Sequence, residues 1–166
     1  MIVFDSSTLI LLAKVELLDD FINDFNGEVI IPLEVKEECC NKKNSFDALL
    51  IGRRIAEHKI RVVKIHNAEL CKKFMLDFSI AQGEAETLVL LTEAKAALLA
   101  VDDRNAIKAC RILNIPFTSA LAILIRLVER GIIDTNKAKV KLDLLVKNGR
   151  YKDTMIKEAK LRLNIT

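Results

Sequence analysis

The sequence predicts a three-layer α/β/α fold with a parallel sheet of about five strands and a helical C-terminal extension. Short apolar runs alternate with helical segments along most of the 166 residues, which is typical of parallel strands joined by crossover helices. One run, residues 96–101, is apolar throughout, as expected for a strand that is buried on both faces. The composition, with 51% hydrophobic and 30% charged residues, is that of an ordinary globular protein.

Five short apolar stretches are predicted as strands. They are residues 2–4, 28–31, 60–65, 96–101 and 115–118. The last contains Pro116 and is expected at or near an edge of the sheet, because proline cannot donate a ladder hydrogen bond. The carboxyl ends of all five would share one edge of the sheet, which is where open α/β sheets bind their ligands.

The segments between the strands carry signals for helix starts and ends. Pro32 suits the first turn of a helix, Ser45 and Asn67 are candidate N-caps, and Gly131 follows a helix end. Residues 42–44 are predicted as a loop. The predicted helices are residues 9–13, 17–25, 34–40, 46–58, 68–76, 83–95, 104–113, 120–130, 136–146 and 153–163.

The chain is predicted to form one domain over residues 1–166, with a core at about 1–131 and the extension at about 132–166. No apolar run approaches the roughly 20 residues of a membrane span, and no basic leader precedes the first strand. The four cysteines form no Cys-x-x-Cys pair and are interpreted as reduced thiols, and two histidines give little support for zinc. A cytoplasmic protein with no membrane partner is expected.

Acidic residues follow the predicted strands at the same edge of the sheet. Asp5 ends the first strand and Asp102 ends the fourth, while Glu38 and Glu84 lie on helices next to these strand ends. Singly, each has an ordinary role as a cap or as a partner of a helix dipole. Together they would repel one another unless a cation offset their charge, and carboxylates favour Mg²⁺ or Mn²⁺. Metal-assisted phosphodiester hydrolysis is the chemistry that this arrangement fits best.

Four segments resemble, in order, the motifs of PIN domains. They are residues 3–10 (VFDSSTLI), 31–38 (IPLEVKEE), 83–86 (GEAE) and 101–104 (VDDR). The chain is most similar to the prokaryotic branch related to VapC toxin ribonucleases, over about residues 2–130. The resemblance implies a parallel sheet between helices and a Mg²⁺- or Mn²⁺-dependent endoribonuclease.

The resemblance also assigns residues and partners. By position it implies a catalytic and metal-binding set of Asp5, Glu38, Glu84 and Asp102, with the Ser7 hydroxyl in support. Glu86 and Asp103 are possible substitutes for their neighbours in this set. The third acid is a glutamate where many PIN domains have aspartate. Related toxins imply a homodimer and a small antitoxin protein that holds the enzyme inactive.

Two alternatives remain open from the sequence. Residues 5–8 resemble the Asp-x-Asp-x-Thr loop of haloacid dehalogenase-type phosphatases, and residues 102–103 resemble their late acidic pair. However, Ser7 stands where those phosphatases have their general acid. The other alternative is a catalytically weak PIN-like module that binds RNA or protein, and the four acids do not separate it from a nuclease.

The C-terminal extension is basic, with nine basic and three acidic residues between Lys137 and Arg162. This charge suits a polyanion, although a solvated helical surface has the same composition. Four of its basic residues are predicted to guide RNA phosphates towards the acidic edge: Lys137, Lys141, Arg150 and Lys152.

Apolar residues of the extension share a helix face that is predicted to pack against the domain or a second subunit. They are residues 138, 142, 145 and 146. Residues 46–55 and 121–128 carry further apolar side chains, for which a core role is at least as well supported as an interface role.

Overall fold

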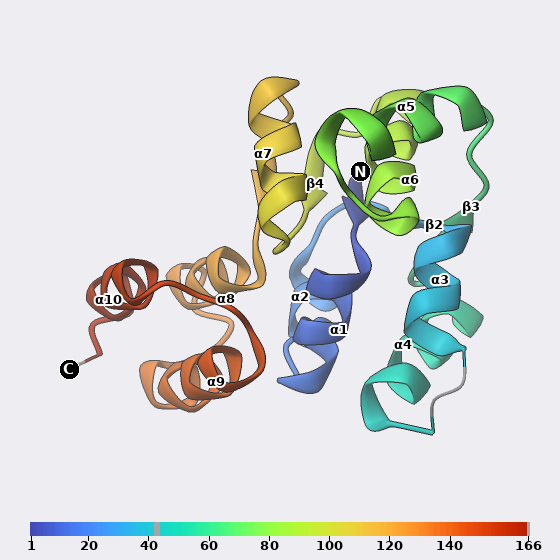
Figure 1. Ribbon diagram of the computed structural model, residues 1–166. Helices are drawn as coiled ribbons and strands as arrows, with labels where there is room; N and C mark the ends of the chain where they lie inside the picture. The colour runs from blue at the N-terminus through green and yellow to red at the C-terminus, as the bar shows by residue number, and fades with distance from the viewer. Residues whose placement is uncertain (42–43, 166) are drawn as a thin grey trace.

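A five-stranded parallel sheet forms the middle layer of the protein in the computed structural model (Figure 1), which describes residues 1–41 and 44–165. The loop predicted at Lys42 and Lys43 therefore lies outside the described residues. The strand order is β3-β2-β1-β4-β5. The strands are β1 (Ile2–Phe4), β2 (Val29–Pro32), β3 (Arg61–Val63), β4 (Leu98–Ala100) and β5 (Phe117–Thr118). This arrangement confirms the predicted fold class.

The helices of the described chain cover both faces of the sheet. Helices α5, α6 and α7 lie on one face, whereas α1 to α4 and α8 lie on the other, with α9 and α10 beyond α8 (Figure 1). They are α1 (Ser6–Lys14), α2 (Leu18–Asp24), α3 (Leu33–Cys40), α4 (Phe46–Ala56), α5 (Ala68–Phe78), α6 (Gln82–Glu93), α7 (Arg104–Ile112), α8 (Ala120–Glu129), α9 (Thr135–Asn148) and α10 (Asp153–Arg162). None of the described helices is long and apolar enough to cross a membrane.

Strand β1 is central and fully buried, between β2 and β4. Alternate side chains point to opposite faces of a strand, so Ile2 and Phe4 contribute to the core under α1 and α8, and Val3 contributes to the core under α6. Strand β5 lies at an edge, as Pro116 predicted. The sheet thus separates two apolar cores and carries the carboxyl end of β1 into the middle of the protein.

Side-chain caps fix several helix starts. Helix α1 begins at Ser6, earlier than the predicted residue 9, because the Asp5 side chain accepts a hydrogen bond from the Ser7 amide. Asn67 caps α5 as predicted, accepting from the Leu70 amide at 2.9 Å. Ser45 stands at the N-cap position of α4 without a side-chain capping bond. The starts of α1, directly after β1, and of α5 are therefore determined by short local sequence signals.

The C-terminal extension, which follows residue 131, packs against α8. Ala138, Leu142 and Leu145 of α9 are buried as predicted. The prediction was wrong for Val146, which is 38% exposed, because it lies about 100° around the helix from Leu145 and reaches the edge of the apolar stripe. Most apolar residues of α8 are buried, which supports their core role.

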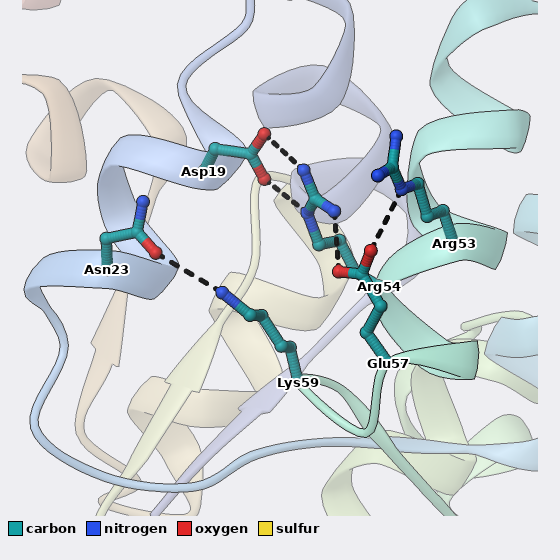
Figure 2. Close-up of polar contacts among 6 residues, drawn as sticks. All are labelled: Asp19, Asn23, Arg53, Arg54, Glu57 and Lys59. Carbon is teal, nitrogen blue, oxygen red and sulfur yellow. Dashed lines mark hydrogen bonds and ion pairs between the residues drawn. The ribbon is translucent and has the colours of Figure 1, made fainter.

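A cluster of charged side chains joins α2 to α4 on the surface (Figure 2). The Arg54 guanidinium donates to both oxygens of Asp19, at 2.6 and 2.7 Å, and to Glu57 at 2.7 Å. The Arg54 side chain is only 16% exposed, and its bonds with Asp19 lower the pKa of that carboxyl. A bidentate pair with a largely buried arginine is stronger than an ordinary surface ion pair.

Replacing Arg54 with methionine is expected to lower the free energy of unfolding by about 1–2 kcal/mol, measured by urea unfolding at pH 7. Arg53→Met is the matched control, with an expected effect within about 0.5 kcal/mol, because Arg53 is 73% exposed. The lowered pKa of Asp19 adds stability above its unfolded-state pKa. The difference between wild type and Arg54→Met should therefore shrink as pH falls through the folded-state pKa. Equal effects of the two substitutions at pH 7 would contradict this account.

Candidate active site

A cavity of about 600 Å³ opens at the carboxyl ends of β1 and β4. Its walls come from α1, from the first turns of α6 and α7, and from the connection between α9 and α10. We call it the acidic cleft. Its charged lining residues are Glu84, Asp102, Asp103, Lys14, Arg104 and Arg150. Acids from separate parts of the sequence thus meet at the predicted edge of the sheet, with basic groups beside them.

Asp5, which follows β1, is not itself a lining residue of the cleft, because only 1% of its surface is exposed. Its Oδ2 atom accepts hydrogen bonds from the Ser7 hydroxyl and the Ser7 amide. Its Oδ1 atom is buried and has no hydrogen-bond partner among the described residues. Burial raises the pKa of Asp5 to about 6, although the Ser7 hydrogen bonds act in the opposite direction. A buried, unpartnered carboxylate oxygen is costly, and a cation would satisfy it.

Glu84 lies in the first turn of α6, where its Oε2 atom accepts from the Ala81 amide at 2.9 Å. Burial raises the pKa of Glu84 to about 7, and the negative charges of Asp103, Asp5 and Glu38 act in the same direction. Glu84 is therefore repelled by these three acids.

Glu38 approaches the same turn of α6 because residue 83 has no side chain. A Cβ atom at Gly83 would lie 2.5 Å from Glu38 Oε1, which is closer than real Cβ contacts allow. The glycine therefore lets the Glu38 carboxylate lie against the N-terminal turn of α6, where the helix dipole favours negative charge. A side chain at position 83 would require the Glu38 carboxylate to move away from this turn.

Asp102 is held by three hydrogen bonds. Its Oδ2 atom accepts from the Thr8 hydroxyl and the Ala120 amide, both at 2.9 Å, and its Oδ1 atom accepts from the Tyr151 hydroxyl at 2.8 Å. Burial raises the pKa of Asp102, and these hydrogen bonds oppose the rise. Sequence reasoning missed both side-chain donors. Thr8 lies within the first motif, whereas the only signal for Tyr151 was that it is the chain's single tyrosine, beside a predicted turn.

The two substitute acids lie in different places. Asp103 lines the acidic cleft, and its Oδ1 atom caps α7 by accepting from the amides of Asn105 and Ala106. The Glu86 carboxylate instead accepts hydrogen bonds from the Glu34 amide at the start of α3 and from the Gln82 side chain at the start of α6. Asp103 is therefore the better placed of the two.

The four basic residues of the extension that were predicted to guide RNA lie in different surroundings. Lys137 forms an ion pair with Asp20 at 2.9 Å, and Lys141, whose side chain is 8% exposed, pairs with Glu16 at 3.0 Å. These two lysines attach α9 to α2 and to the end of α1. Arg150 lines the acidic cleft, and Lys152 is exposed at the start of α10.

The chemistry of the site fits a hard divalent cation. In the described part of the chain, no three His, Cys, Asp or Glu side chains already converge as a metal-binding group. However, the donors are all oxygens and one oxygen of Asp5 lacks a partner among the described residues. Burial, and after it the neighbouring negative charges, raises the pKa of Glu84. Carboxylates of this kind select Mg²⁺ or Mn²⁺ over softer metals.

Comparison with known proteins identifies one family. A family model described as a PIN domain matches residues 1–164. No curated protein and no solved structure gave a match.

In EDTA, wild type is expected to lose stability relative to Glu84→Gln as pH rises from about 4.5 to 7. The reason is that the folded state holds the Glu84 proton more tightly than the unfolded chain does, since the folded-state pKa is raised from 4.5 to about 7. Stability gained from that proton is complete below the unfolded-state pKa and disappears above the folded-state pKa. The difference should reach on the order of 2 kcal/mol in urea unfolding across this range. If the free energies of unfolding of the two proteins changed with pH in parallel, the pKa of Glu84 would not be raised on folding.

Proposed function

This chain belongs to the PIN-domain family, and we propose that its acidic cleft is the active site of a metal-dependent ribonuclease. PIN domains are generally nucleases, so a phosphodiester hydrolase is the activity to which the family points. The observation that carries the proposal is the buried Oδ1 atom of Asp5, which has no partner among the described residues and lies beside further acids. A carboxylate in that state is suited to binding a cation.

The proposed metal-binding set is Asp5, Glu38, Glu84 and Asp102. A bound Mg²⁺ or Mn²⁺ ion would activate water and offset the charge that develops on the phosphate. The protein's own contribution is to hold the acids: Ser7 fixes one oxygen of Asp5, and the glycine at position 83 admits Glu38 to the turn that carries Glu84. Asp103 is a further candidate at the same cleft.

RNA is the proposed substrate, and the basic residues of the cleft are the proposed phosphate contacts. Lys14 and Arg104 lie on helices that face the acids, and Arg150 comes from the extension. Lys152 follows close by. Lys137 and Lys141 are already paired with acids of the same chain, so the proposal gives them a structural role. The chain offers one tyrosine and no tryptophan for base stacking, which leaves binding mostly to phosphate contacts.

The resemblance to VapC-type ribonucleases extends the proposal to a cytoplasmic toxin that forms a homodimer and binds a small antitoxin protein. Phe46 and Leu49 of α4 are 58% and 61% exposed, so this helix provides apolar surface for a protein partner. Light scattering at tens of micromolar tests the dimer. A neighbouring gene for a small DNA-binding or disordered protein would support the antitoxin.

Two other functions make different predictions. A PIN-like module that binds RNA or protein without cleaving would take up Mn²⁺ or RNA but release no products. A haloacid dehalogenase-type phosphatase would transfer phosphate to Asp5. The phosphatase is disfavoured because Ser7 stands where those enzymes have their general acid. The Ser7 hydroxyl donates a hydrogen bond to Asp5.

Asp5→Asn is expected to weaken Mn²⁺ binding and to slow single-turnover RNA cleavage by about 100-fold or more, because loss of a metal ligand should cost at least as much as loss of a group that supports one. Glu86→Gln is the matched control and should retain activity, since both oxygens of Glu86 already accept hydrogen bonds, from the Glu34 amide and the Gln82 side chain. Calorimetry and a labelled RNA measure the two effects. Cleavage by Asp5→Asn at the wild-type rate would refute the proposed site.

Arg150→Ala is expected to weaken RNA binding in EDTA and to reduce the slope of log affinity against log salt by roughly one unit, as for one lost phosphate contact. Lys137→Ala is the control: it removes a basic residue of the same extension that already pairs with Asp20. Its salt slope should match that of wild type. Filter binding at several salt concentrations distinguishes them, and an unchanged slope for Arg150→Ala would remove this residue from the RNA-binding surface.

A further inference from the structure

The connection between α9 and α10 contributes a side chain to the acidic cleft. Tyr151 lies on this connection and lines the cavity beside Asp102. Its hydroxyl donates to Asp102 Oδ1 at 2.8 Å, across 49 positions of sequence. The C-terminal extension is therefore in direct contact with an acid of the proposed metal-binding set, in addition to packing against α8.

The hydrogen bonds of Asp102 show what Tyr151 adds. The Oδ2 atom already accepts two bonds, from Thr8 and from the Ala120 amide. A carboxylate oxygen accepts about two hydrogen bonds, so Oδ2 is fully used. The Oδ1 atom accepts the single bond from Tyr151, which leaves it room for one more partner. Tyr151 is thus the one described donor to the oxygen that is still able to bind a cation.

The other oxygen of Asp102 is held by α8. The amide of Ala120, the first residue of α8, donates to Asp102 Oδ2 at 2.9 Å. The N-terminus of α8 and the Tyr151 hydroxyl therefore hold the two oxygens of the same carboxylate.

Gly149 makes this placement possible. A Cβ atom at Gly149 would lie 2.5 Å from Cε2 of the Tyr151 ring and 2.9 Å from the Leu145 carbonyl oxygen. The Gly149 amide donates to that same carbonyl at 2.7 Å, closing the end of α9. Any larger residue would have to displace both the Tyr151 ring and the Leu145 carbonyl at the end of α9. The turn is thus shaped to bring the tyrosine ring back towards the cleft.

We propose that Tyr151 is a positioning residue of the active site, which orients Asp102 so that its Oδ1 atom can bind the divalent cation. The inference rests on the proposed nuclease and assigns the C-terminal extension a part in building the metal site. A group that supports a metal ligand in this way contributes roughly 10- to 100-fold in metal affinity or activity.

The test is Tyr151→Phe, which keeps the ring and removes only the hydroxyl. Mn²⁺ affinity, measured by calorimetry or by the electron paramagnetic resonance signal of free Mn²⁺, should fall roughly tenfold or more. RNA affinity in EDTA should stay close to wild type, because Arg150 and the packing of the ring are retained. The melting temperature in EDTA should fall slightly, because one hydrogen bond to a buried carboxylate is lost. A tyrosine that served only to attach the extension would show the same small loss of stability with unchanged Mn²⁺ affinity, which would overturn the proposal.

Gly149→Ala is the second variant, because it keeps the hydroxyl but displaces both the ring and the end of α9. It should weaken Mn²⁺ binding in the same direction as Tyr151→Phe. Gly52→Ala is its control, since a Cβ atom at Gly52 would meet no other atom within 4 Å. This variant should bind Mn²⁺ as wild type does. Normal Mn²⁺ affinity in Gly149→Ala, with a normal melting temperature, would count against the inference.

The outcomes separate this inference from the proposed function. If wild type binds Mn²⁺ and cleaves RNA, and Tyr151→Phe does both equally well, the positioning role is wrong and the nuclease stands. If wild type neither binds Mn²⁺ at millimolar concentration nor cleaves RNA, the nuclease is wrong and the inference fails with it. Tighter Mn²⁺ binding by Tyr151→Phe would mean that the tyrosine competes with the cation, which also overturns the proposal.

Discussion

The burial of the Asp5 carboxylate is the constraint on which the rest of the site depends. Strand β1 is central and covered on both faces, so the residue that ends it is delivered under the surrounding helices. Ser7 satisfies one oxygen, and the other has no partner in the described chain. Among the described residues, no lysine or arginine forms an ion pair with Asp5, Glu84 or Asp102. The negative charge is therefore left for a cation from outside, which links the fold to the proposed chemistry.

Structural and functional roles coincide in the residues of this edge. Asp5 caps α1 and Asp103 caps α7, while Glu84 accepts from the backbone at the start of α6. Each acid is thus fixed by the helix that follows or contains it. A rigid helix start holds a carboxylate more firmly than a loop would, and such preorganisation favours both metal binding and catalysis. The ordinary capping interpretation and the catalytic one therefore describe the same side chains.

The C-terminal extension combines attachment with a contribution to the cleft. Lys137 and Lys141 fasten α9 to acids near α1 and α2, at sequence separations of 117 and 125 residues. With α9 held there, its end and the following turn reach the cleft, where Arg150 and Tyr151 face the acids. Lys137 and Lys141 were expected to contact RNA. Instead they hold in place the segment that carries Arg150, which is proposed to contact RNA. Some basic residues of the extension therefore attach it to the rest of the protein, whereas Arg150 faces the cleft.

The sequence by itself determined the fold class, the edge position of β5 and the acids that end β1 and β4. These features follow from apolar periodicity, proline chemistry and strand ends, all of which are local. Glu38 and Glu84 were identified from the resemblance together with their place on helices near the strand ends. Only the tertiary structure showed that Gly83 admits Glu38 and that Tyr151 binds Asp102. Those contacts depend on how helices distant in sequence pack together, and no spacing or periodicity in the chain encodes them directly.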